Sequence, residues 1–112
     1  MWRAKLIIPF ALVSVSTAHA NFAEIPRYDV PKHCSELASL GGSHSNVLEE
    51  SCFQQEQSEY NTLKLQWASL KPAIKKHCDS LARLGGHGSY VLLKACVDQE
   101  QQAGQSTKKF EY

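Results

Sequence analysis

Apolar residues recur along the chain at the spacing of amphipathic helices, three or four positions apart. Four stripes have this spacing: Val30, Cys34, Leu37 and Ala38; then Leu48, Cys52, Tyr60, Leu63 and Trp67; then Ile74, Cys78, Leu81 and Ala82; and last Leu92, Cys96 and Ala103. Polar and glycine-rich stretches separate them. The pattern predicts an all-α chain of four helices, arranged as two antiparallel helical hairpins.

The two hairpins are copies of one another. A shift of 44 residues brings 15 of the 26 positions in 32–57 onto identical residues, both cysteines among them. Repeat 1 covers about residues 30–68 and repeat 2 about residues 72–108. Open repeat arrays usually need three or more copies, so the duplication indicates one closed domain.

Glycine and serine residues mark the same turn in both copies. A glycine pair ends the first helix, where a left-handed residue is often required. A serine then precedes the second helix and suits its N-cap, with Asn46 and Glu49 as an alternative cap pair in repeat 1. The residues expected in these turn and cap roles are Gly41, Gly42, Ser45, Gly85, Gly86 and Ser89.

The cysteines lie at equal distances from these turns. In repeat 1, Cys34 comes seven residues before the glycine pair and Cys52 seven residues after the serine, about 10 Å from the turn on each helix. The two should face one another, as should Cys78 and Cys96. We therefore expect the pairs Cys34–Cys52 and Cys78–Cys96, each contributing roughly 3 kcal/mol; pairing between repeats is the alternative.

The N-terminal residues predict export. A short basic stretch, an apolar run of about ten residues from Leu6 to Val15, and small residues at Ala18 and Ala20 have the layout of a signal peptide over residues 1–20; a retained membrane anchor is the alternative. Residues 21–112 then form a single small helical domain. Removing residues 1–20 changes the formal net charge of the chain from +1 to −1. An even number of cysteines in so short an exported chain favours disulfides. The polar tail, 104–112, is expected to be disordered.

Neither metal binding nor catalysis has a recognisable motif in the chain. Each cysteine pair is separated by 17 residues, with no C-x2-C knuckle, and the adjacent His33 and Cys34 point about 100° apart on a helix. Paired cysteines leave no thiolate nucleophile. Motifs of serine hydrolases, zinc proteases and phosphate-binding loops are missing from the sequence. We expect a non-enzyme with no catalytic residue, metal site or cofactor.

Glu56 and Glu100 occupy equivalent positions, four residues after a cysteine. An antiparallel hairpin brings each beside the start of its preceding helix, where the dipole favours a carboxylate. We expect both to be structural helix-end groups, with His33 and His77 as possible bridging partners. Tyr90 is expected to pack against the cystine.

The two repeats carry opposite charge. Residues 21–68 have a net charge of −4 and residues 69–112 a net charge of +3. Attraction between the repeats, or a solvated surface, explains this simply. The alternative is a partner-binding surface, including that of a head-to-tail dimer, formed by Lys71, Lys75, Lys76, Glu49 and Glu50.

The cysteine, glycine and glutamate pattern also resembles a family. Its residues are Cys34, Gly41, Gly42, Cys52, Glu56, Leu63, Trp67, Cys78, Gly85, Ser89, Tyr90, Leu92, Leu93, Cys96, Glu100 and Ala103. Over about residues 25–103 the chain resembles small exported proteobacterial proteins with duplicated cysteine repeats. The resemblance implies a location in the bacterial envelope and brings no catalytic residue with it.

These features favour a periplasmic or secreted protein-interaction module, such as an inhibitor, an accessory subunit or an envelope-stress protein. Its partner would be another envelope protein or a second copy. The alternative function is a periplasmic carrier of a small ligand or metal. Neither a nucleic-acid arm nor a membrane span remaining after cleavage is expected.

Overall fold

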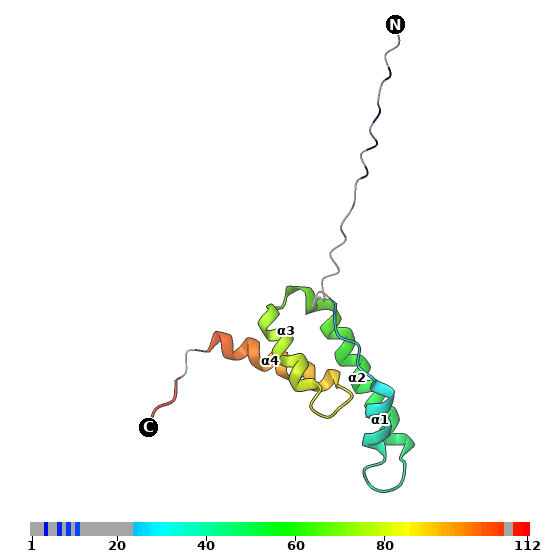
Figure 1. Ribbon diagram of the computed structural model, residues 1–112. Helices are drawn as coiled ribbons and strands as arrows, with labels where there is room; N and C mark the ends of the chain where they lie inside the picture. Colours follow the sequence, from blue (N-terminus) through cyan, green and yellow to red (C-terminus); the bar gives the residue numbers. More distant parts are fainter. Residues whose placement is uncertain (1–3, 5–6, 8, 10, 12–23, 107–108) are drawn as a thin grey trace.

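The chain folds into four α-helices, which the computed structural model describes over residues 4, 7, 9, 11, 24–106 and 109–112 (Figure 1). The helices are α1 (Val30–Ala38), α2 (Asn46–Gln66), α3 (Pro72–Ala82) and α4 (Tyr90–Gln105), and a 3-10 helix, η1 (Trp67–Ser69), follows α2. The described residues contain no strand, which confirms the all-α prediction. Most of the predicted signal peptide, residues 1–20, lies outside the described residues.

Side-chain caps begin three of the helices. Ser45 Oγ accepts a hydrogen bond from Leu48 N, and Ser89 Oγ accepts one from Leu92 N, so both predicted N-caps are confirmed. Asp29 caps α1 through Lys32 N. Pro72 begins α3, where its missing N–H costs nothing.

The predicted glycine turns need a correction. α1 ends with Ser39 as its C-cap, so the helix stops before the glycine pair rather than at it. The left-handed residue is the second glycine of each pair: φ is +92° at Gly42 and +104° at Gly86, whereas Gly41 and Gly85 have no positive φ. The tail prediction was also too long, because α4 continues through Gly104 to Gln105.

A disulfide joins the helices of each hairpin. Cys34–Cys52 links α1 to α2 and Cys78–Cys96 links α3 to α4, with Cα atoms 5.5 and 5.4 Å apart. Both predicted pairs are confirmed. The hairpins are thus two equivalent units, each closed by one covalent cross-link.

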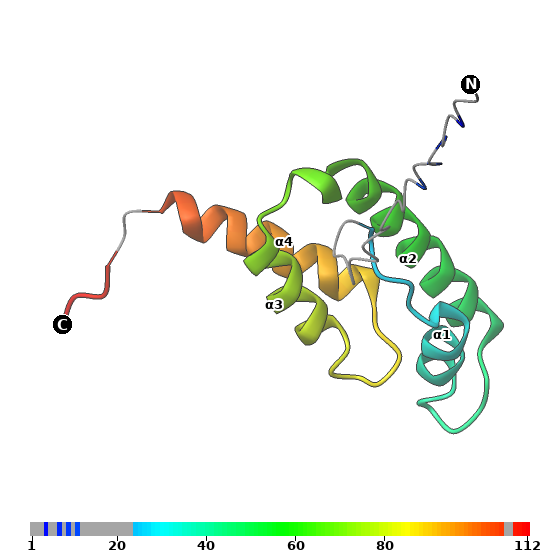
Figure 2. The ribbon, with the colours of Figure 1, turned by 45° about the horizontal axis from the view of Figure 1, so that its top comes forward.

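α2 also packs against α4 and so connects the hairpins (Figure 2). The main core lies between the C-terminal part of α2 and the helices of repeat 2. Its members are Tyr28, Leu63, Trp67, Leu70, Cys78, Ala82, Tyr90, Leu93, Cys96 and Val97. The predicted stripes were partly wrong: Leu37, Leu48, Leu81, Leu92 and Ala103 are exposed. In α4, the side facing both α2 and α3 is centred on Leu93 and Val97, which are fully buried.

Among the described residues, no helix combines the length and apolar character that crossing a bilayer requires.

Candidate functional site

A buried carboxylate connects the two repeats. Glu56, on α2, is 2% exposed. It accepts hydrogen bonds from Ser89 Oγ and from Tyr90 N, each at 2.6 Å, and so lies at the N-terminus of α4. The positive end of the α4 dipole and these two donors stabilise the negative charge. The prediction placed Glu56 near the start of α1, and Glu56 does line a pocket with Val30 there. Its hydrogen bonds, however, cap a helix of the other repeat, because α4 packs on the same face of α2.

His33 adjoins this carboxylate, with Nε2 3.3 Å from Glu56 Oε1. The corresponding pair in repeat 2, His77 and Glu100, is 3.5 Å apart, and about half of each side chain is exposed. Glu100 lies beside Ile74 at the start of α3, as predicted. Both expected histidine–glutamate contacts therefore form, but only the one in repeat 1 is part of the interior.

Cys52 also lies close to His33 and Glu56, and potential ligand atoms of the three residues fall within 4.8 Å of one another. This set does not fit a metal ion. The Cys52 sulfur is bonded to Cys34 and is no thiolate. Both Glu56 oxygens already accept hydrogen bonds from α4. One histidine would remain as an uncommitted ligand.

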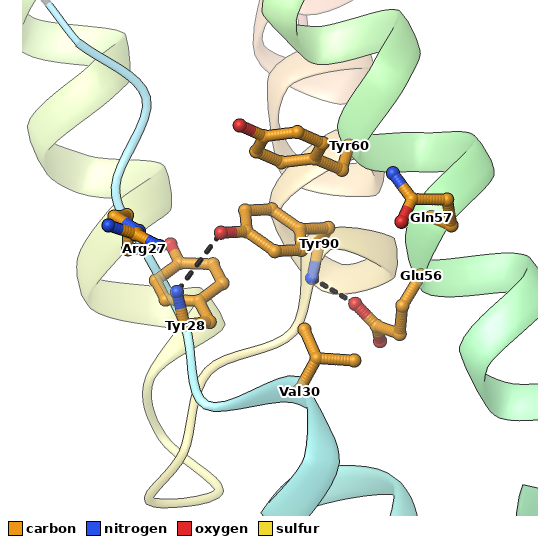
Figure 3. Close-up of a pocket in the computed structure, with 7 residues that line it drawn as sticks. All are labelled: Arg27, Tyr28, Val30, Glu56, Gln57, Tyr60 and Tyr90. Carbon is orange, nitrogen blue, oxygen red and sulfur yellow. Dashed lines mark hydrogen bonds between the residues drawn. The ribbon is translucent and has the colours of Figure 1, made fainter.

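An aromatic stack lies beside Glu56 (Figure 3). The Tyr90 ring packs between those of Tyr28 and Tyr60, with centroids 4.6 and 4.9 Å away. Its hydroxyl donates to Pro26 O at 2.7 Å and accepts from Tyr28 N at 3.0 Å. Tyr90 therefore holds the extended residues 24–29, which we call the N-terminal strap, and it belongs to the same buried cluster as Cys78 and Cys96.

Tyr28 anchors the strap to repeat 2. Its hydroxyl donates to Asp79 Oδ1 at 2.7 Å, and Arg83 lies over its ring at 4.9 Å. Burial, reinforced by the hydrogen bond to Asp79, raises the pKa of Tyr28 far above its usual range. Burial likewise raises the pKa of Tyr90. Both phenols therefore stay protonated in the folded chain well past neutral pH.

Gly88 makes this anchoring possible. A Cβ at Gly88 would lie 2.4 Å from the Tyr28 ring, and the residue has a φ of +85°. The equivalent position in repeat 1 is His44. A glycine in repeat 2 at the position of a histidine in repeat 1 is therefore a sequence signal for the strap. Tyr28 itself has no equivalent tyrosine in repeat 2 that would point to its role.

The stack opens on a shallow pocket of about 230 Å³, which Arg27, Gln57 and Tyr60 line together with the groups described above. The Glu56 carboxylate and the hydroxyls of Tyr28 and Tyr90, which belong to buried residues of its lining, are already bonded within the protein. These groups serve to join repeat 1, repeat 2 and the strap. We call this assembly the inter-repeat joint.

The most regular exposed feature lies at the ends of the hairpins. Three leucines of repeat 1 and their equivalents in repeat 2 are exposed to matching degrees: Leu37 and Leu81 by 43% and 40%, Leu40 and Leu84 by 79% each, and Leu48 and Leu92 by 54% and 50%. We call the hairpin end at residues 36–50 tip 1 and the one at residues 80–94 tip 2. Single exposed leucines are common, but three matched pairs form a repeated apolar surface.

The tips are accessible from a common groove. His33, Leu37 and Cys52 line it from repeat 1, and Val91 and Leu92 line it from repeat 2. A contact between Glu36 and His87, 2.8 Å apart, brings the tip 2 loop against α1. The apolar surfaces of the two tips therefore lie on neighbouring parts of the molecule.

The tips differ in charge. Tip 1 contains Glu36, Glu49 and Glu50 and neither lysine nor arginine, whereas tip 2 contains Arg83 and Lys94 and neither aspartate nor glutamate. Of the predicted surface residues, Glu50, Lys71 and Lys76 are exposed and Glu49 is partly exposed. Lys75 is a correction, because its stem is buried and its Nζ lies over the Trp67 ring at 5.6 Å.

Helical spacing assigned Leu37, Leu48, Leu81 and Leu92 to the core, whereas Leu40 and Leu84 directly precede the glycine pairs and lie outside the predicted stripes. The signal for the tips was the duplication itself. Leucine recurs at both copies of each position even where the helices end, which a turn alone does not require.

No protein family, curated protein or solved structure matches this chain in sequence or fold.

Proposed function

We propose that this chain is an exported, non-enzymatic protein-interaction module that binds through its two hairpin tips. The observation that carries the proposal is the matched exposure of three leucines at each tip. Exposed apolar groups are costly in water, and their repetition on two rigid, cross-linked hairpins suits a protein surface with two apolar contacts.

Export rests on two features. The described cysteines are all in disulfides, which indicates an oxidising environment. Residues 1–20 have the signal-peptide pattern, so we propose a periplasmic or secreted protein whose mature chain begins at Asn21. Mass spectrometry of the exported chain tests the cleavage site directly.

Chemical crosslinking in the producing cells tests the binding function. The tagged wild-type protein should form specific crosslinked products that disappear in the double variant L40S/L84S. Leu65→Ser is the matched control, since Leu65 is 89% exposed on α2 outside the tips. Products that are identical in all three proteins, or no products at any level of expression, would contradict the proposal.

A further inference from the structure

The two tips differ from one another mainly in charge, and this difference indicates their occupant. We propose that tip 1 of one molecule binds tip 2 of a second copy of this chain, in a head-to-tail contact. This inference rests on the proposed function, which it deepens by naming the partner.

Apolar complementarity is the first argument. Each tip presents the same three leucines at nearly the same exposure. Leu40 and Leu84, the most exposed of them, lie in the loops beyond the helix ends and are free to enter a facing surface. One contact between two molecules removes the leucines of both tips from water, whereas in a single chain these leucines remain exposed.

Charge complementarity is the second argument. Tip 1 carries three glutamates without lysine or arginine, and tip 2 carries Arg83 and Lys94 without an acid. Glu50 and Lys94 even occupy equivalent positions of the two copies. Two tip 1 surfaces facing each other would repel, whereas tip 2 has no acidic residue to oppose tip 1, so the charges favour the mixed contact.

Ion pairs reduce the positive charge that tip 2 presents, so the contrast between the tips comes mainly from the glutamates of tip 1. Arg83 binds Asp79 at 3.0 Å and Lys94 binds Asp98 at 2.6 Å. Each aspartate lies one helical turn further from the loop than its cation. Tip 2 therefore presents two paired cations and no acidic residue of its own, whereas the charged groups that flank the leucines of tip 1 are Glu36, Glu49 and Glu50.

Such a contact is heterologous, because each molecule binds one neighbour through tip 1 and another through tip 2. One tip therefore remains free at each end of an open assembly. It produces open chains of molecules, or a ring if the rotation between neighbours closes. Three leucines and a few charges per side make a small interface, for which weak association is expected.

Sedimentation velocity of the purified, oxidised protein tests this proposal. The average mass should rise with concentration and fall as salt is added, because salt screens the charged rims. L40S and L84S should each remain monomeric alone. Mixed together they should form a 1:1 dimer and nothing larger, since one intact tip 2 then meets one intact tip 1. L65S should behave as wild type.

Charge exchange gives a second test. E50K and K94E should each weaken self-association by about tenfold, and the double variant E50K/K94E should recover it, because the complementary signs have only changed places. Circular dichroism and melting curves of each variant separate a lost interface from a lost fold.

A wild-type chain that stays monomeric at millimolar concentration, or an L40S and L84S mixture that stays monomeric, would overturn the head-to-tail contact. The proposed function has its own outcome. If a monomeric chain still forms crosslinks to a different protein that L40S/L84S abolishes, the tips bind proteins and the second copy is not their partner.

Discussion

At the scale of single residues, the largest difference between the repeats lies in two glutamates that the sequence makes equivalent. Glu56 is buried and caps α4, whereas Glu100 is partly exposed beside His77. Spacing within a repeat predicted the same role for both. The difference arises from contact between repeats, which the spacing of residues within one hairpin does not contain.

Glu56→Gln should lower the free energy of unfolding by roughly 1–3 kcal/mol. The amide retains one acceptor oxygen, so Ser89 or Tyr90 N then faces an NH2 group, and the charge at the helix dipole is lost. Urea unfolding followed by circular dichroism measures the change. Glu100→Gln is the matched control and should lie within about 0.5 kcal/mol of wild type; equal losses in the two variants would contradict the buried cap.

Gly88→Ala should be more destabilising than Gly86→Ala by roughly 1–3 kcal/mol. Both glycines have positive φ, so the backbone strain is shared, but only at Gly88 does the new Cβ collide with Tyr28. Melting curves of the two variants give the difference. In a Tyr28→Ala background the excess cost of Gly88→Ala should vanish, and persistence of that excess would show that the ring contact is not its cause.

At the scale of elements, hydrophobic periodicity predicted the four helices, their hairpin pairing and both disulfides, because these depend on residues close in sequence. The strap could not be predicted this way. Residues 24–29 form no helix and are held by Asp79, Arg83 and Tyr90, all more than 50 residues away. The tips were misassigned for a related reason: helical spacing identifies a common face, but it does not say whether another element covers that face.

The strap predicts an alkaline transition. The pKa values of Tyr28 and Tyr90 are raised in the folded chain, mainly by burial. Below about pH 10 these phenols are protonated in both states, so their contribution to stability is constant. Above it they ionise first in the unfolded chain, and stability should fall by up to about 1.4 kcal/mol per pH unit for each of them.

Urea unfolding at a series of alkaline pH values, followed by phenolate absorbance, measures this loss. Tyr28→Phe should be less stable near neutral pH, because the hydrogen bond to Asp79 is gone, but its stability should fall less steeply above pH 10. The comparison removes the contribution of other groups that titrate in that range. Parallel curves for the two proteins would mean that Tyr28 ionises as easily folded as unfolded.

At the scale of the whole molecule, stability is divided unevenly. The core cluster includes Cys78 and Cys96 but none of the buried residues of α1, and only Cys34 and Ala38 of that helix are buried. Repeat 2 therefore has a core around its cystine, whereas α1 contributes only Val30 to the edge of that core and is otherwise held by packing on α2, by its cross-link and by the contacts of His33 and Glu36.

Removing the two disulfides should thus have different effects, although each closes the same sequence separation of 18 residues and contributes about 3 kcal/mol by loop entropy. C34S/C52S should release α1 and leave the rest folded, because the core cluster remains. C78S/C96S should loosen the core itself. Amide hydrogen exchange resolves the two patterns, and loss of protection along the whole chain in C34S/C52S would contradict the division.

The contact between Glu56 and α4 also makes the two repeats unequal, so that their order along the chain matters. Repeat 1 supplies the acceptor and repeat 2 the donors, and the aromatic and apolar residues that continue this surface on α2, Tyr60 and Leu63, correspond by the 44-residue shift to Gly104 and Thr107. A third hairpin fused after α4 would meet Glu100 but no surface on which to pack. Placing tyrosine at position 104 and leucine at position 107 would be the smallest substitution needed to lengthen this protein one hairpin at a time.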